Sequence, residues 1–409
     1  MTGPSREHDV VLFGATGYVG RLVAGYLAET APPDLRVALA GRSRERLAAV
    51  AAELPAPGRA WPLLEADSAD PASMTRLAES TRVLVTTVGP YTRHGLPVVE
   101  ACARAGTHYA DLTGEVLFVR EAIDRCDAVA RETGARLVHA AGYDSIPSDL
   151  AVFLLAERAR ADGAGGLTDV RLVAGLRGGF SGGTVASMRG MVEDAARDKA
   201  VRRLLADPFS LSPDRAAEPD TRQPPDATPP ALAADGRWTA PFVMASFNTR
   251  IVRRSNALQE WAYGRGLRYG ESMSAGRGIT GAFTAAGITT GLAAAVGALA
   301  FAPTRALVDR VLPAPGTGPS ESAREKGWFR MVVDADTEGG RHYRATVAGT
   351  GDPGYAATSV MLGQVALGLA LEGDRLPERA GSLTPATALG GVLVERLRAA
   401  GHTYEVTAL

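Results

Sequence analysis

The chain has 409 residues and a net charge of −1 at pH 7, and 22% of its residues are charged. A chain of this length exceeds what one hydrophobic core usually supports, so we expect two domains or one elaborated domain. A net charge close to zero gives no general attraction to nucleic acid, and we expect no nucleic-acid partner. The polar residues 1–9 lack the apolar run of a signal peptide, so we expect a cytoplasmic protein.

The residue types that usually bind metals are scattered along the chain. Cys102 and Cys126 are isolated on expected helices, without Cys-x-x-Cys spacing, and we interpret them as buried thiols of a reducing compartment. The six histidines form no pair at helical spacing, whereas zinc requires clustered ligands. We therefore expect no metal site.

The most informative stretch is 10–20, where an apolar strand runs into a Gly-x-x-Gly-x-x-Gly turn that opens a helix. Gly14 allows the sharp exit from the strand, Gly17 lets a pyrophosphate approach the backbone, and Gly20 lets the helix pack closely on the sheet. The free N–H groups of that helix then face the phosphates. A second strand at 36–40 completes a βαβ unit, which distinguishes a dinucleotide site from a simple tight turn. The cofactor contacts expected here are Gly14, Thr16, Gly17, Tyr18, Val19 and Gly20.

The end of the second strand distinguishes NAD from NADP. An NAD site places an acidic residue there, whereas an NADP site places an arginine against the 2′-phosphate. This chain has Arg42 at that position, no acid at 41–43, and Ser43 as a further hydrogen-bond donor. A solvated start of the next helix would explain Arg44 and Arg46, but not the missing acid. The charge pattern therefore predicts NADPH as the cofactor.

Alternating strands and helices in the first part of the chain indicate a doubly wound parallel sheet, and ligands bind such sheets at the carboxyl ends of the strands. Asp67 ends the third expected strand, and Gly89 and Pro90 follow the buried strand at 83–88. We expect Asp67 to contact the cofactor, and Gly89 and Pro90 to line the nicotinamide pocket. The polar segment 111–115 would position substrate or cap the following helix, and both interpretations stay open.

Hydride transfer also needs a proton source at the reacting carbon. Short-chain dehydrogenases use a Tyr-x-x-x-Lys pair, and none of the ten tyrosines here has a lysine four residues on. The candidate catalytic acids are Tyr143, in the polar cluster 142–149, and Tyr91, with His94 as a further candidate. Initiation of the next helix explains every residue of the cluster except Tyr143. For the cluster as a whole, a capping role and a catalytic role therefore both stay open.

The pattern changes after about residue 150. Strand-like runs recur at 242–252, 261–269, 328–334 and 342–349, and a Glu-Gly-Gly hairpin signal joins the last two, so we expect a mostly antiparallel sheet. Residues 208–230 hold seven prolines, and we interpret them as a long irregular excursion.

The predicted fold class is therefore α/β, an N-terminal Rossmann doubly wound parallel sheet with a second α+β domain built on a mostly antiparallel sheet. We predict a dinucleotide-binding domain at 1–150 and a substrate or dimerisation domain at 151–380. The C-terminal segment 381–409 is expected to return to the Rossmann domain as a helix. A homodimer is one assembly that this arrangement allows.

Residues 282–302 carry no charge over 21 positions, which is long enough to cross a bilayer. Nine of the 21 are alanine and three are glycine, and the large apolar residues recur every three to five positions. Such a stripe opposite a small-residue face favours a helix that is buried in the protein or covers the substrate. Peripheral contact with a membrane and a true span are the alternatives, and the contact would make the protein membrane-associated.

Six motifs in order along nearly the whole chain resemble the saccharopine dehydrogenase-like oxidoreductases. They are Gly14-Ala-Thr-Gly-Tyr-Val-Gly20, Ala40-Gly-Arg42, Thr87-Val-Gly-Pro-Tyr91, Tyr109-Ala-Asp-Leu-Thr-Gly-Glu115, Gly142-Tyr-Asp-Ser-Ile-Pro-Ser-Asp149 and Leu383-Thr-Pro-Ala-Thr-Ala388. Within that family the chain looks closest to the actinobacterial trans-acting enoyl reductases. The combination is far more specific than any one of the motifs.

The resemblance implies an NADPH-dependent reductase with a Rossmann domain and an α+β second domain. In the enoyl reductase branch it implies hydride delivery to the β-carbon of an α,β-unsaturated acyl thioester, polyketide or lipid-like, with protonation of the α-carbon. The acyl group would be carried by a separate polyketide synthase. Family membership does not fix the substrate.

Two alternatives remain at this point. The first is a saccharopine-type reductase of an imine derived from an amino acid. It would need an arginine for the substrate carboxylate, for which Arg177, Arg189 and Arg277 are candidates. The second is a non-catalytic NADPH-binding protein associated with a membrane.

Overall fold

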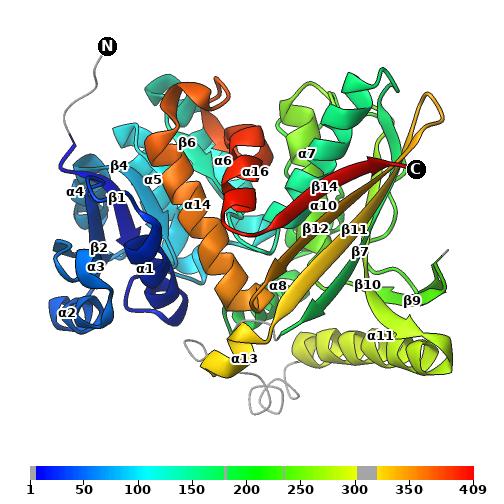
Figure 1. Cartoon of the computed structure of the whole chain (residues 1–409), viewed down its shortest axis with the longest axis horizontal. Helices are drawn as coiled ribbons and strands as arrows, with labels where there is room; N and C mark the ends of the chain where they lie inside the picture. The colour runs from blue at the N-terminus through cyan, green and yellow to red at the C-terminus, as the bar shows by residue number, and fades with distance from the viewer. Residues whose placement is uncertain (1–5, 179–181, 234, 302–319) are drawn as a thin grey trace.

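The computed structural model describes residues 6–178, 182–233, 235–301 and 320–409. Two seven-stranded sheets lie side by side, the first built mostly from the N-terminal third of the chain and the second from later segments (Figure 1). The predicted class, a Rossmann-type α/β sheet with a second α+β unit, is confirmed.

All strands of the first sheet are parallel, and their order is β13-β6-β5-β4-β1-β2-β3. Its central strands are almost wholly apolar because helices bury both faces of such a sheet. In β1, Val10 and Leu12 belong to one hydrophobic core, and Val11 and Phe13 belong to the core on the opposite face. The strands are β1 (His8–Phe13), β2 (Val37–Gly41), β3 (Leu63–Glu65), β4 (Thr81–Thr86), β5 (His108–Asp111), β6 (Arg136–Val138) and β13 (Gly381–Leu383).

Helices α4, α5 and α6 supply the core on the Val11 face, and α1, α14 and α16 supply it on the Val10 face. Helix α14 is apolar on nearly every side because the sheet, α1 and α16 enclose it. The helices associated with this sheet are α1 (Tyr18–Thr30), α2 (Arg44–Glu53), α3 (Ala56–Arg59), α4 (Pro71–Ser80), α5 (Tyr91–Ala105), α6 (Val116–Thr133), the π-helix η1 (Pro353–Ala357), α14 (Thr358–Leu371), the 3-10 helix η2 (Gly373–Arg375), α15 (Pro385–Ala388) and α16 (Gly391–Ala399).

The second sheet has the order β14-β12-β11-β7-β10-β9-β8, in which β7 and β10 are parallel and the other pairs are antiparallel. Helix α7 packs on β7, β11 and β12, and α10 packs on β10. The strands are β7 (Leu167–Arg177), β8 (Ala231–Leu232), β9 (Arg237–Pro241), β10 (Arg268–Arg277), β11 (Trp328–Thr337), β12 (His342–Thr350) and β14 (Thr403–Ala408). The remaining helices are α7 (Ile146–Ala161), α8 (Gly182–Arg197), α9 (Lys199–Ala206), α10 (Ala245–Leu258), α11 (Gly278–Ala300) and α13 (Glu321–Glu325).

Helix α10 corrects the expectation of a strand at 242–252. Almost every residue of α10 is buried, including three arginines, so its sequence lacks the polar face that marks an amphipathic helix. These arginines donate to backbone carbonyls of distant segments, as when Arg254 binds the oxygens of Leu211 and Ser382, each at 2.6 Å. Arg250 pairs with Asp226 at 2.7 Å and so holds the proline-rich excursion against the helix.

The expected strand at 261–269 is also wrong for most of its length, because β10 begins at Arg268. The Asn256 side chain closes a turn after α10 by accepting from the N–H of Tyr263 at 2.9 Å and donating to the oxygen of Gly264 at 2.9 Å. A side chain that binds the local backbone in this way competes with strand pairing.

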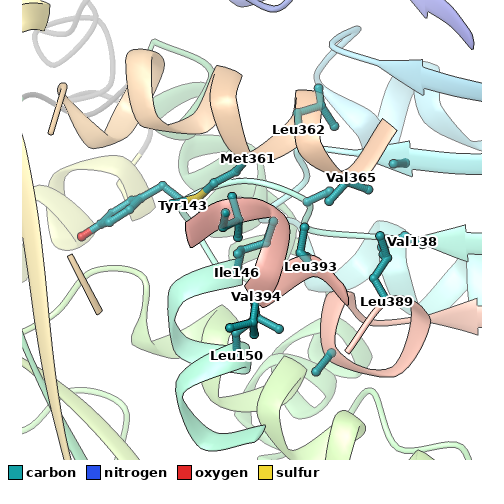
Figure 2. Packing of buried hydrophobic residues seen from close by; sticks show 14 of the residues in the cluster. Val138, Tyr143, Ile146, Leu150, Met361, Leu362, Val365, Leu389, Leu393 and Val394 are labelled. Atoms are coloured by element: carbon teal, nitrogen blue, oxygen red, sulfur yellow. The ribbon is translucent and has the colours of Figure 1, made fainter. Parts of the chain in front are cut away.

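The end of the chain contributes to both sheets. β13 pairs with β6 in the first sheet, and β14 pairs with β12 in the second. Between them, α16 packs against α14 in the core that Figure 2 shows, where Leu393 and Val394 lie beside Met361, Ile146 and Leu150. This core joins elements of both sheets. The C-terminal segment 381–409, which was expected to return to the Rossmann domain as a helix, therefore connects the two halves of the structure.

Helix α11 lies at the outer edge of the second sheet, against β9, β10 and α8 (Figure 1). Of the expectation that this helix is buried or covers the substrate, the burial half is wrong: only 11% of its most apolar window, within 278–299, is buried, and the side chains of Ile279 and Phe283 are 77% and 75% exposed. A second stretch of similar length and hydropathy, 353–371, is 78% buried in the core around α14. The two stretches therefore differ in environment despite similar composition.

Gly20 and Gly25 lie on the same helix but differ in what a side chain would meet. A Cβ at Gly20 would lie 2.1 Å from the carbonyl oxygen of Gly14, whereas a Cβ at Gly25 would meet nothing within 4 Å. We expect Gly20→Ala to lower the free energy of unfolding by about 3 kcal/mol, because backbone must move. Gly25→Ala should be neutral or stabilising by about 0.5 kcal/mol. Urea unfolding of both variants measures the difference, and equal effects would contradict the close packing of α1.

Candidate active site

A cavity of about 580 Å³ lies where the carboxyl ends of the first sheet face the helices of the second half. The glycine turn and the segment after β4 form one side of it, through Gly17, Tyr18, Val19, Thr87, Gly89 and Pro90. The segments after β5 and β6 contribute Leu112, Gly114, Gly142 and Asp144. This is the position at which doubly wound sheets bind their ligands.

The glycine turn leaves the start of α1 open to the cavity. Gly14 has a φ of +90°, which a side chain rarely tolerates, and its oxygen accepts from the Thr87 hydroxyl at 3.1 Å. Gly17 is the N-cap of α1 and supplies no side-chain cap, so the first N–H groups of the helix lack a side-chain partner at the N-cap. Such N–H groups and the helix dipole bind phosphate. The predicted turn therefore has the shape that fits the pyrophosphate of a dinucleotide.

The predicted turn residues divide into two sets. Gly17, Tyr18 and Val19 line the cavity and would contact the cofactor directly. Gly14, Thr16 and Gly20 lie outside the lining and shape the turn. Gly89 and Pro90, expected to line the nicotinamide pocket, are also at the cavity wall.

The arginines after β2 have different surroundings. Arg44 donates to the carbonyl oxygen of Leu63 at 3.0 Å, and Ser43 accepts from the N–H of Arg46 at 3.2 Å as the N-cap of α2. Arg42 is exposed and makes no hydrogen bond or ion pair with the described residues. Its guanidinium is therefore free to bind a 2′-phosphate, and the Ser43 hydroxyl, which accepts from Arg46, keeps its own proton for donation.

Asp67 does not line the cavity. Its carboxylate accepts from the N–H of Ala69 at 3.0 Å and shapes the turn before α4. His94 lies near Ser68, with its Nδ1 3.5 Å from that hydroxyl, and is also outside the lining. Both residues therefore make local contacts. The cofactor contact expected of Asp67 and the acid role considered for His94 have no support in this geometry.

Tyr91 reaches the cavity wall, but its hydroxyl is engaged by the backbone. It donates to the oxygen of Thr86 at 3.1 Å and accepts from the N–H of Leu112 at 3.1 Å. Burial, with the nearby carboxylates of Asp111 and Glu115, raises the pKa of Tyr91 well above its usual value. The geometry therefore gives Tyr91 a positioning role and leaves its proton poorly available.

The segment 111–115 builds the wall instead of reaching into the cavity. The Glu115 carboxylate accepts from the N–H groups of Tyr91 at 3.0 Å and Thr92 at 2.8 Å, which caps the start of α5. The Ser187 hydroxyl, on α8, donates to the same carboxylate at 2.6 Å. Neither interpretation left open for this segment is supported as it was stated: Glu115 caps α5, which precedes the segment, and α6, which follows it, has no side-chain cap.

Tyr143 does not point into the cavity. Its ring packs edge-on against Phe329, with centroids 5.1 Å apart, and its buried hydroxyl has no hydrogen-bond partner among the described residues. Figure 2 shows the hydroxyl directed away from the labelled core residues. Burial raises the pKa of this hydroxyl above its usual value. The prediction that Tyr143 is the proton donor therefore has no geometric support.

The rest of the cluster 142–149 holds the two halves together. Ser145 occupies the N-cap position of α7 but makes no capping hydrogen bond, and its hydroxyl donates to Asn248 at 3.0 Å. The Asp149 carboxylate accepts from Ser255 and from the N–H of Ala386 at 2.8 Å. Both contacts reach across to distant segments, so helix initiation alone does not explain the cluster.

The side of the cavity that faces away from the glycine turn is apolar. Its wall comes from α8, from α10 with the segment leading into it, and from α11. Of these, the sequence indicated the helix at 282–302 as one that covers the substrate, and it gave no indication of the others. The residues that form this apolar wall are Met188, Met191, Val192, Phe242, Met244, Phe247, Leu292 and Val296. The proposed cofactor cradle and a hydrophobic compartment therefore share one cavity.

The contrast between Arg42 and Arg46 gives a test of the NADP preference. Both are exposed, but Arg42 directly follows β2 whereas Arg46 lies within α2. We expect Arg42→Ala to weaken NADPH binding by roughly tenfold to a hundredfold, the value of a charge-assisted hydrogen bond, with little change for NADH. Titration calorimetry with both cofactors measures this, with Arg46→Ala as the control. Equal loss for NADPH and NADH would contradict a phosphate contact.

The comparisons with known proteins agree with this geometry. Residues 10–138 match the family model of the saccharopine dehydrogenase NADP binding domain. The chain is 46% identical to a Mycobacterium ulcerans protein and 47% identical to a Mycobacterium tuberculosis protein, both named trans-acting enoyl reductase, over 100% of each chain. Another Mycobacterium tuberculosis relative, 50% identical over 100% of both chains, carries that name provisionally.

A solved structure shows the same fold at much lower identity. The apo saccharopine dehydrogenase (L-Glu forming) of Saccharomyces cerevisiae has a TM-score of 0.56 and 13% identity, and the match covers 98% of this chain and 100% of that one. Residues 10–138, which match the NADP binding domain of the family, include the glycine turn and Arg42. The chain belongs to the saccharopine dehydrogenase-like family, in the group of the trans-acting enoyl reductases, and is an NADP-dependent oxidoreductase.

Proposed function

We propose that the protein reduces the C=C bond of an α,β-unsaturated acyl thioester with a long apolar acyl chain. The observation that carries this proposal is the shared cavity, in which a dinucleotide cradle meets an apolar wall from three helical segments. Burying an acyl chain is favourable by about 0.8 kcal/mol for each CH2 group. The names of the mycobacterial relatives support the same reaction.

The residues divide the work along the cavity. NADPH supplies the hydride when it is bound. The start of α1 holds its pyrophosphate and Arg42 holds its 2′-phosphate. Gly89 and Pro90 form the wall at the reacting end, while Met188, Met191 and Phe242 surround the acyl chain and exclude water.

The imine alternative is less well matched to this cavity. An amino-acid-derived substrate brings a carboxylate, which is costly to bury without a cationic partner. Among the described residues, no arginine or lysine lines the cavity. Of the three candidates named above, Arg189 pairs with Glu193 at 2.8 Å on α8, and Arg177 and Arg277 end strands outside the lining. The chemistry of the wall therefore favours an acyl substrate.

We further propose that the acyl group arrives on the carrier protein of a separate polyketide synthase. The relatives are named trans-acting, which describes an enzyme that works on another protein's intermediate. The cavity is open to the outside, as delivery by a tethered carrier requires. A thioester presented in this way needs no charged recognition group inside the cavity.

A bulky residue in the apolar wall tests the substrate class. We expect Met191→Trp to raise KM at least tenfold for a long-chain 2-enoyl thioester and to change KM for a crotonyl thioester by less than about twofold, because the added ring fills space used by the distal chain. NADPH oxidation measures both, and Leu371→Trp, exposed at the end of α14, is the control.

The wild-type protein is assayed beside the variants with an imino acid. Turnover of the imino acid but not of either thioester would favour the saccharopine-type reaction. Tight NADPH binding without turnover of any of these substrates would favour the non-catalytic alternative. An equal effect of Met191→Trp on long and short thioesters would contradict the assignment of the apolar wall.

We also propose that α11 rests on a lipid surface, so that the protein is cytoplasmic and peripherally membrane-associated. The helix carries no charge over its 23 residues, and its large side chains Ile279 and Phe283 are exposed. A helix that is apolar on all sides is rarely left in water. Its other face, through Leu292 and Val296, lines the cavity, which would place an apolar substrate path beside the lipid.

Vesicle flotation tests this contact. We expect Phe283→Ser to reduce the partition of the protein onto phosphatidylcholine vesicles by roughly tenfold, since burial of a phenylalanine is worth about 1.5–3 kcal/mol. Leu371→Ser, which removes an exposed leucine elsewhere, should have no effect. Failure of the wild type to float, or a homodimer in solution that Phe283→Ser dissociates, would contradict the proposal.

A further inference from the structure

We propose that Asp144, and not a tyrosine, is the catalytic acid that protonates the α-carbon of the substrate. This inference rests on the proposed enoyl reduction. Asp144 lies in the turn after β6, at the carboxyl edge of the first sheet, and its side chain lines the shared cavity together with Gly114, Gly142 and Tyr91. In the sequence, initiation of the next helix was enough to explain it, together with the rest of the cluster 142–149 apart from Tyr143.

The carboxyl group of Asp144 is not committed to the protein. No described residue forms a hydrogen bond or an ion pair with it, and Ser145 occupies the N-cap position of α7 in its place. Gly114 lies beside this carboxyl, since a Cβ built on it would be 3.8 Å from the Asp144 Oδ2 atom. Because glycine has no side chain, the space next to the carboxyl stays open. A small molecule at this place would meet the acid directly.

The other ionisable groups along the cavity wall are engaged. Asp226 pairs with Arg250 at 2.7 Å, and the Tyr91 hydroxyl is held between two backbone groups. Tyr18 accepts from Arg324 at 2.6 Å, and Tyr355 accepts from the N–H of Gly182 at 3.1 Å. Asp144 is therefore the ionisable group at the described wall without a hydrogen-bond or ion-pair partner.

The protonation state of Asp144 suits this role. Desolvation by burial raises the pKa of Asp144 to about 7, so the carboxylic acid is well populated at neutral pH. An acid is most effective when its pKa lies near the working pH. Burial raises the pKa of the nearby Tyr91 and Tyr143 hydroxyls above the usual value, which makes both weaker acids than Asp144.

The proposed step balances in atoms and charge. Hydride from the reduced cofactor forms the new C–H bond at the β-carbon, and the π electrons move to the α-carbon and the thioester oxygen. The Asp144 O–H bond breaks as its proton forms the C–H bond at the α-carbon. The saturated thioester and the oxidised cofactor leave, and water returns a proton to the Asp144 carboxylate.

Asp144→Asn tests the assignment against Tyr143→Phe, which removes the neighbouring unpartnered hydroxyl. We expect Asp144→Asn to lower kcat for a 2-enoyl thioester by 10²- to 10⁴-fold, the usual contribution of general acid catalysis, and to leave the NADPH dissociation constant within about threefold. Tyr143→Phe should change neither. Calorimetry with NADPH gives the binding readout independently of turnover.

The pH dependence gives a second readout. Because the protonated acid is the active form, kcat should fall as pH rises through about 7, and this fall should be absent from the residual activity of Asp144→Asn. Glu271 on β10 also has its pKa raised to about 7 by burial, but it accepts from Asn248 at 3.0 Å outside the cavity lining. Glu271→Gln should therefore keep the wild-type pH profile.

A direct titration does not depend on turnover. Burial raises the pKa of Asp149 to about 7 as well, so carbon-13 NMR of aspartate-labelled apoprotein should show more than one carboxyl that titrates near pH 7, and one of these signals should disappear in Asp144→Asn. Full activity of Asp144→Asn, or loss of kcat in Tyr143→Phe, would overturn the assignment. If instead the wild type does not reduce the thioester, the proposed function fails, and the titration still shows whether Asp144 is a protonated acid in the cavity.

Discussion

The structure depends on a buried polar tie between its two sheets. The Asp149 carboxylate, at the start of α7, accepts from Ser255 on α10 and from the N–H of Ala386 after β13. One turn earlier, Ser145 donates to Asn248. Such a network is stable in the interior only when its members are satisfied, and it then fixes one arrangement. Because both sheets contribute to the cavity, this tie sets the distance between the cofactor cradle and the apolar wall.

The arrangement explains how one cavity can serve two different ligands. Its first end offers the N–H groups at the start of α1, and the unpaired guanidinium of Arg42 follows β2 outside the cavity lining; both suit phosphates. Its second end offers methionine and aromatic side chains, and methionine adapts to irregular apolar shapes. Between them lies Asp144, an acid without a protein partner. The order of these groups along the cavity matches a reaction in which a hydride and a proton add to an acyl chain.

The sequence predicted the first sheet and its glycine turn because local signals and tertiary structure agree there. The turn at Gly14 needs a positive φ, and the strands are apolar runs that end at the cavity. It failed at α10, where buried arginines satisfied by carbonyls removed the amphipathic pattern. The sequence also could not show which of Tyr143 and Asp144 lines the cavity, because the side of a turn that faces the cavity depends on distant contacts such as that of Tyr143 with Phe329. Of the apolar wall, only α11 had a local signal, its uncharged apolar stretch; the other wall segments lie far apart in sequence and had none.

The central claim is that hydride passes from NADPH to the β-carbon of an unsaturated acyl thioester in this cavity. The most direct measurement uses NADPH deuterated at the transferring C4 position, a long-chain 2-enoyl thioester, and mass spectrometry of the product. The account predicts a saturated thioester with one deuterium, located at the β-carbon. A saturated product without label, or label only in an amine formed from an imine, would contradict it.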